Sequence, residues 1–70
     1  METYSGRFAA RLRELRTKAN LSQTELAERI GSKQRNVSNW EMGETSPPFD
    51  ILPTLAEALA VSIAELMPKE

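Results

Sequence analysis

The sequence predicts an all-α fold, a compact bundle of five helices. Two stretches, Leu21 to Leu26 and Val61 to Leu66, share one helix-start pattern: an apolar residue, then a serine, then a glutamate three positions after the serine. Such a serine and glutamate form a capping box, and the flanking apolar residues pack together as a hydrophobic staple. Elsewhere apolar residues recur every three or four positions, which is the spacing of one helix face, and no strand pattern emerges.

Length and composition limit the kinds of protein this can be. A chain of 70 residues has room for one domain, 1–70, and buries only about 60% of the surface that its unfolded form exposes. It contains no cysteine and no histidine, so we expect no disulfide, no metal site and no cofactor. No apolar run reaches the roughly 18–20 residues of a membrane span, and the N-terminus lacks a signal-peptide pattern. We therefore expect a soluble, cytoplasmic protein.

Charge is distributed unevenly along the chain. The net charge is −1, but residues 1–40 hold eight basic and four acidic side chains, whereas residues 41–70 hold one basic and six acidic ones. The first part therefore carries +4 and the second −5. We expect the basic part to meet phosphates and the acidic part to be repelled by them.

The first helix is expected to begin at Ser5, which can cap it, and to end near Asn20. One face of this helix is apolar, with residues spaced four, three and four apart: Phe8, Leu12, Leu15 and Ala19. Its other faces carry arginines. The pattern predicts a helix that packs on one side and is solvated on the others.

Two short helices joined by a tight turn come next. The second helix begins at Ser22 and ends at Gly31, because a residue without a Cβ can adopt the left-handed conformation that stops a helix. Ser32 is the expected cap of the third helix, with a register that could differ by one residue. The third helix ends near Gly43 and carries Trp40, which we expect to be core rather than a base-stacking platform.

The outer face of the third helix carries hydrogen-bonding side chains, namely Gln34, Arg35, Ser38 and Asn39. A short helix, a turn with glycine and a second helix with a polar outer face describe a helix-turn-helix, here at about residues 22–42, whose second helix lies in the DNA major groove. Glutamine and asparagine can pair in two places with adenine, and arginine with guanine. An ordinary polar helix surface is the alternative interpretation of these four residues.

Two further helices complete the predicted bundle. The fourth is expected from about Asp50 to Ala60, with Pro53 in its first turn, where the missing N–H is not needed. Its buried residues are expected to be Ile51, Leu52, Leu55, Ala56 and Leu59. The fifth helix starts at Ser62, and Pro68 stops it.

From Phe8 to Met67 the chain resembles the XRE or Cro/C1 type of helix-turn-helix protein, the family of the lambdoid phage repressors. Four blocks in order carry the likeness: RLRELR at 11–16, LSQTELAERIG at 21–31, VSNWEMG at 37–43 and LAEALAVSIAEL at 55–66. The resemblance implies a lambda-repressor-like bundle that binds operator DNA in a sequence-specific manner and regulates transcription, as a repressor. Ala60 departs from the family pattern, because a glycine is usual there.

The resemblance also implies roles for individual residues. The base-reading positions of the family map to Gln34, Arg35, Ser38 and Asn39. The phosphate-contacting positions map to Gln23, Lys33, Asn36 and Arg16. In the family, the glutamine at the position of Gln23 also orients a neighbouring side chain of the third helix. Arg16 and Glu41 map to a partly buried pair that braces the first helix against the third.

A domain of this size reads only a few base pairs, so we expect a homodimer on double-stranded operator DNA, with half-sites about one helical turn apart. The alternative is a protein-interaction module on the same fold, or an antitoxin with a toxin as partner, with weak DNA binding. An enzyme is disfavoured, because acid–base chemistry without His or Cys would depend on carboxylates or lysines scattered over helix surfaces and caps.

Overall fold

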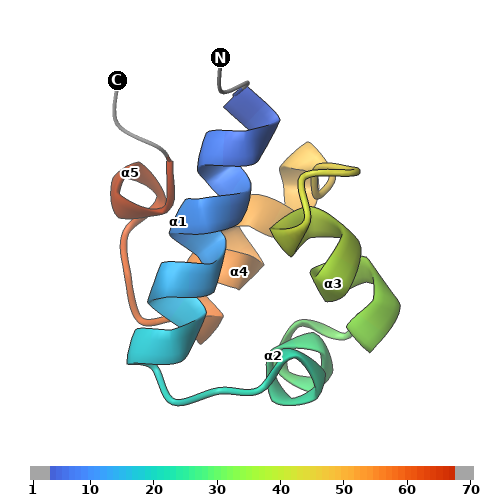
Figure 1. Ribbon diagram of the computed structural model, residues 1–70. Coiled ribbons are helices and arrows are strands. Elements are labelled where there is room, and N and C mark those ends of the chain that lie inside the picture. Colours follow the sequence, from blue (N-terminus) through green and yellow to red (C-terminus); the bar gives the residue numbers. More distant parts are fainter. Residues whose placement is uncertain (1–3, 68–70) are drawn as a thin grey trace.

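The computed structural model describes residues 4–67, and within that range it consists of helices, turns and loops without a strand. The elements in chain order are α1 (Tyr4–Lys18), α2 (Gln23–Ile30), α3 (Gln34–Glu41), the 3-10 turn η1 (Phe49–Ile51), α4 (Leu52–Ala58) and α5 (Ile63–Leu66). Figure 1 shows α1 running through the middle of the bundle, with α5 on one side and α3 on the other, and a loop leading from the C-terminal end of α1 to α2, which lies next to α3. The all-α prediction is confirmed. Within the described part no helix has the length and apolar character of a membrane span.

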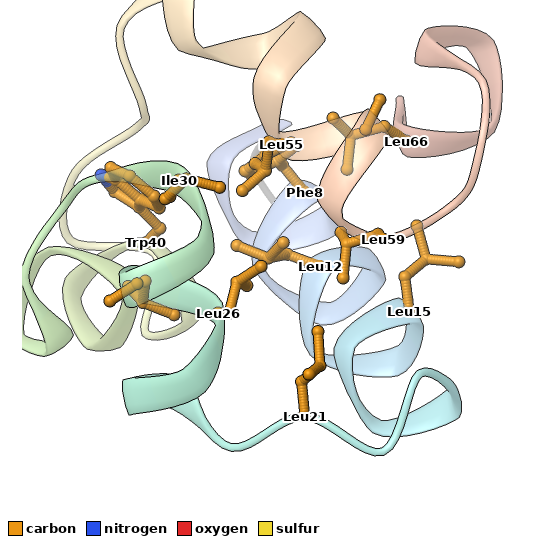
Figure 2. Packing of buried hydrophobic residues seen from close by; sticks show 13 residues of the cluster. Phe8, Leu12, Leu15, Leu21, Leu26, Ile30, Trp40, Leu55, Leu59 and Leu66 are labelled. Atoms are coloured by element: carbon orange, nitrogen blue, oxygen red, sulfur yellow. The ribbon is translucent and has the colours of Figure 1, made fainter.

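Each of the five helices contributes one fully buried side chain to a single core. These side chains are Leu12, Leu26, Val37, Leu55 and Leu66. Figure 2 shows side chains from α1, α2, α4 and α5 converging between the ribbons, with Trp40 of α3 at the edge of the cluster. Full burial of one such side chain contributes about 1.5–3 kcal/mol. Because α2 to α5 are too short to be stable alone, their packing on α1 and on one another holds them in helical form.

The two predicted capping boxes are both present. The Ser22 hydroxyl accepts the backbone N–H of Glu25 at 3.0 Å, and the Ser22 N–H donates to the Glu25 carboxylate at 2.8 Å. These hydrogen bonds lower the pKa of the Glu25 carboxyl. Ser62 and Glu65 repeat the arrangement at the start of α5. Gly31, at φ +70°, ends α2 as expected.

The boundaries of α1 and α4 differ from the prediction. Because α1 begins at Tyr4, Ser5 lies inside the helix and is not its cap. The expected helix from Asp50 is a 3-10 turn that leads into α4 at Leu52. Pro53 explains the difference: it has no N–H to donate to the Phe49 carbonyl, which accepts the N–H of Leu52 instead.

The burial and the C-terminal end of α4 also differ in detail from the prediction. Leu55, Ala56 and Leu59 are buried as expected, whereas Ile51 and Leu52 are only partly buried against the core. The helix ends at Ala58, two residues before the predicted end. Pro68, the expected stop of the fifth helix, lies outside the described residues.

In the turn between α2 and α3, the residue that directly precedes the helix lies one position later in the chain than predicted. Lys33, in extended conformation, precedes α3 and gives it no side-chain cap. The Ser32 hydroxyl instead accepts a hydrogen bond from the Asn36 amide at 2.9 Å. Ser32 is therefore not the helix cap, although its hydroxyl still ties the turn to the first turn of α3.

Ala60, between α4 and α5, adopts a left-handed backbone conformation with φ +58°. The conformation directs the N–H of Val61 to the Ala56 carbonyl at 3.0 Å, which closes the end of α4. A residue with a Cβ pays about 1–2 kcal/mol in this region, whereas glycine does not.

Ala60→Gly is therefore expected to raise the free energy of unfolding by up to about 1 kcal/mol. This value already subtracts the cost of the greater backbone entropy that glycine has in the unfolded chain. Urea unfolding should show a higher midpoint with an unchanged slope. Ala10→Gly is the matched control, because Ala10 is exposed in the middle of α1, where glycine costs about 1 kcal/mol. A loss of stability in both variants would contradict the assignment of strain to Ala60.

Candidate nucleic-acid interface

A buried ion pair joins α1 to the C-terminal end of α3. Arg16 Nε donates to Glu41 Oε2 at 2.6 Å, and its Nη2 donates to Oε1 at 3.0 Å. A third guanidinium donor, Nη1, reaches the carbonyl of Leu21 at 2.7 Å. Glu41 is only 3% exposed. The hydrogen bonds that Arg16 donates to the Glu41 carboxylate raise the pKa of the guanidinium above its ordinary value.

The remaining hydrogen-bonding capacity of Glu41 positions a glutamine of α2. Gln23 Nε2 donates to Glu41 Oε1 at 3.1 Å. An ionised carboxylate only accepts hydrogen bonds, so Gln23 must present its NH₂ group to Glu41 and its carbonyl oxygen away from it. Glu41 therefore determines which end of the Gln23 amide faces outward.

The outward oxygen of Gln23 holds the first residue of α3. Gln34 Nε2 donates to Gln23 Oε1 at 2.7 Å. One N–H of Gln34 is used in this contact, which leaves its second N–H and its own carbonyl oxygen on the exposed side. A continuous chain of hydrogen bonds thus runs from Arg16 through Glu41 and Gln23 to Gln34, and we call these four residues the polar relay.

The rest of the expected base-reading face lies along α3. Gln34 and Arg35 are exposed, and Ser38 and Asn39, one turn further on, are half-buried. The opposite side of the helix is buried through Val37, Trp40 and Glu41. Within residues 4–67 Arg35 has no hydrogen-bond or ion-pair partner, so its guanidinium is available to a ligand. Trp40 lies in the core, as expected.

The expected phosphate-contacting residues occupy three different settings. Lys33 is exposed next to the start of α3. Asn36 is exposed but its amide is bound to Ser32. Arg16 is half-buried, and three of its five N–H donors are used by Glu41 and Leu21, which leaves two for a ligand.

Sequence reasoning missed Arg13. Its guanidinium lies 3.5 Å from the carbonyl of Glu41, a weak contact at the C-terminal end of α3. A positive charge is favourable there, because the last carbonyls of a helix carry partial negative charge. The only sequence signal was its spacing of three residues from Arg16, which places both side chains on the same face of α1.

The comparisons with known proteins agree with this geometry. A model of the helix-turn-helix family matches residues 12–66, which is most of the chain. The chain belongs to the helix-turn-helix family. This confirms the resemblance and the lambda-repressor-like fold.

Two solved helix-turn-helix structures resemble the chain over nearly their whole length. The restriction-modification controller protein C.AhdI from Aeromonas hydrophila is 36% identical, with a TM-score of 0.86, over 90% of this chain and 91% of that one. The P22 c2 repressor, in complex with a synthetic operator, is 32% identical, with a TM-score of 0.79, over 86% of this chain and 91% of that one.

A longer relative shares the same helix-turn-helix region. The HTH-type transcriptional activator BcrR of Enterococcus faecalis is 35% identical over 63 residues, which are 90% of this chain and 31% of the activator. The chain therefore spans less than a third of the length of that relative.

Removing one member of the ion pair should strongly destabilise the fold. Arg16→Met leaves the Glu41 carboxylate buried without its partner, which costs roughly 3–5 kcal/mol. Arg16→Lys should lie between this variant and the parent, because an ammonium cannot bind both carboxylate oxygens as a planar fork. Urea unfolding followed by circular dichroism measures both losses.

Glu14→Gln is the control, because it breaks the exposed pair of Glu14 with Arg11, and exposed pairs contribute about 0–1 kcal/mol. The double variant Arg16→Met/Glu41→Met should recover part of the loss, since no unpaired charge stays buried. Equal midpoints for Arg16→Met and Glu14→Gln would show that the buried pair does not stabilise the fold.

Proposed function

We propose that this domain reads operator DNA with α3 in the major groove, as a transcriptional repressor. The polar relay carries the proposal, because it connects the buried ion pair to an exposed side chain at the start of α3. A glutamine on an ordinary helix surface does not need to be held in one orientation by a chain of hydrogen bonds. Holding Gln34 in one orientation before DNA arrives lowers the conformational entropy lost on binding.

The orientation of Gln34 suits adenine. Adenine presents an acceptor at N7 and a donor at N6 in the major groove, and a glutamine amide matches both. The N–H and the carbonyl that Gln34 does not use for Gln23 supply this pair. Arg35, with its unpaired guanidinium, suits guanine, and Ser38 and Asn39 would contact bases one turn further along the helix.

The remaining polar residues around α3 would contact phosphates. We assign this role to Lys33, Asn36 and Gln23, with Arg16 contributing its two unused N–H donors. The charge distribution supports the assignment, because residues 1–40 carry +4 and contain α1, α2 and nearly all of α3. The acidic remainder of the chain would then point away from the duplex.

Two copies on adjacent half-sites would complete the operator complex. One recognition helix reads only a few base pairs, and dimeric helix-turn-helix proteins bind half-sites about 34 Å apart. The choice of repressor follows the likeness to the P22 c2 repressor, which is 32% identical over 86% of this chain.

The proposal is for binding without catalysis, metal or cofactor. Several carboxylates have structural partners: Glu41 is bound by Arg16, and Glu25 and Glu65 complete capping boxes. A role on operator DNA would also place the protein in the cytoplasm, in agreement with the expectation from the sequence.

Selection of bound sequences from a random duplex pool, at a stated salt concentration, tests the proposal. We expect a two-fold symmetric motif with half-site centres about one helical turn apart. If no sequence is enriched, the fold would instead serve protein interaction, and a partner such as a toxin should be sought.

The polar relay predicts that Gln23 and Gln34 act on the same base. Gln34→Ala should relax the preference at one base pair by about 1–3 kcal/mol. Gln23→Ala should relax the same position, because Gln34 loses the contact that orients it, and the double variant should lose less than the sum of the single losses. Binding to a panel of single-base operator variants measures each effect.

Two other variants calibrate this measurement. Arg35→Ala should relax a different base pair, while Lys33→Ala should weaken binding to all sequences alike and reduce the salt dependence by about one phosphate contact. Additive losses from Gln23→Ala and Gln34→Ala, at unrelated positions, would contradict the orienting role of Gln23.

A further inference from the structure

Phe49 is an aromatic side chain that the fold leaves in water. It is 87% exposed, compared with 59% for Met42 and 46% for Ile63, the other large apolar residues exposed in the described part. It opens η1 at the end of the loop that follows α3. Burying such a side chain contributes about 1.5–3 kcal/mol, which this chain alone does not gain.

An apolar pocket lies next to Phe49 in the sequence and in the fold. It has a volume of about 90 Å³ and is lined by Phe8, Ser46, Pro47, Leu52 and Met67. Phe49 is not among its lining residues, although the pocket includes residues on both sides of it in the sequence. A cavity of about 150 Å³ holds a whole benzene molecule, so an open pocket of this size accepts the leading part of a phenyl ring.

We propose that Phe49 of one copy inserts into this pocket of a second copy, and that the second copy does the same in return. The proposal rests on the operator-bound dimer proposed above and names its contact. A two-fold interface requires a surface that is complementary to itself. The exposed ring and the pocket can meet that requirement, because three of the five lining residues, Ser46, Pro47 and Leu52, lie within three positions of Phe49 and so share one face with it.

The position of this surface fits two recognition helices on one duplex. In Figure 1 the loop and η1 lie beside the N-terminal half of α1, at the end of the molecule opposite α2. Gln34 is at the α2 end of α3, and the loop leaves from the other end. Two copies that meet through their loops would therefore present their two α3 helices in succession along the axis of the duplex.

The dimensions of the domain also favour a small contact. Its Cα trace measures 32 × 23 × 23 Å, and half-site centres lie about 34 Å apart. Copies at that separation touch only at their edges, so a projecting side chain is needed to bridge them. Phe49 is the most exposed large apolar side chain among the described residues.

The area of the contact predicts a dimer that is weak without DNA. A phenylalanine buries at most about 150–250 Å², and two such contacts fall short of the roughly 1,200 Å² of a stable interface. Glu44 and Asp50 near the ring add like-charge repulsion between the copies. Without DNA the interface would therefore be populated only at millimolar protein concentration, and on DNA it would form fully, because the half-sites supply a high effective concentration.

Titrations on two duplexes separate this contact from DNA binding itself. Phe49→Ala should leave affinity for a duplex with one half-site unchanged, and should weaken binding to a duplex with two half-sites by roughly tenfold or more. Ser46→Trp, which fills the rim of the pocket, should have the same effect, and the double variant should add nothing further. Ile63→Ala, a change of an exposed apolar residue on α5, should alter neither affinity.

The contact is also measurable without DNA. At millimolar protein concentration the methyl signals of Leu52 and Met67 should shift with concentration in the parent chain and not in Phe49→Ala. Absence of that shift would overturn the interface even if operator binding is established. Loss of one-half-site binding in Phe49→Ala, or loss of cooperativity in Ile63→Ala alone, would also overturn it. Failure of every variant and the parent to bind any duplex would instead contradict the proposed function.

Discussion

The buried ion pair between Arg16 and Glu41 is the interaction on which the rest of the structure depends. A carboxylate with 3% exposure is tolerated only when its charge is neutralised and its oxygens accept hydrogen bonds. Arg16 meets both needs and also binds the carbonyl of Leu21 just before α2. One guanidinium therefore connects α1, the entry to α2 and the end of α3.

The same ion pair links stability to recognition. Glu41 Oε1 accepts hydrogen bonds from both Arg16 and Gln23, and the Gln23 oxygen in turn accepts one from Gln34. Each member is held by the one before it, so the orientation of an exposed side chain is determined by a buried charge. An apolar contact between α1 and α3 could stabilise the fold equally well, but it would provide no hydrogen bond to carry outward.

The small size of the domain explains why its helices rely on both caps and packing. The helices α2, α3, α4 and α5 have eight, eight, seven and four residues, and isolated helices below about 12–15 residues are marginal in water. Two capping boxes hold the starts of α2 and α5, and one fully buried side chain from every helix joins the common core. Such a core is too small to cover every apolar group, and Phe49 stays outside it.

The sequence by itself determined what depends on near neighbours in the chain. Both capping boxes, the stop at Gly31 and the apolar faces of the helices follow from residues within about four positions of one another, which interact however the chain folds further. The family resemblance added the proposed base-reading face, the pair between Arg16 and Glu41, and the unusual alanine at position 60.

Only the tertiary structure decided which long-range contacts form. It decided that Arg13 lies beside the end of α3 at Glu41, and that Gln23 of α2 lies between Glu41 and Gln34 of α3. It also decided which end of the Gln23 amide faces Gln34, and that Phe49 remains exposed beside a pocket. The physical reason is that a long side chain has several possible partners, and the packing of the helices selects the one within reach.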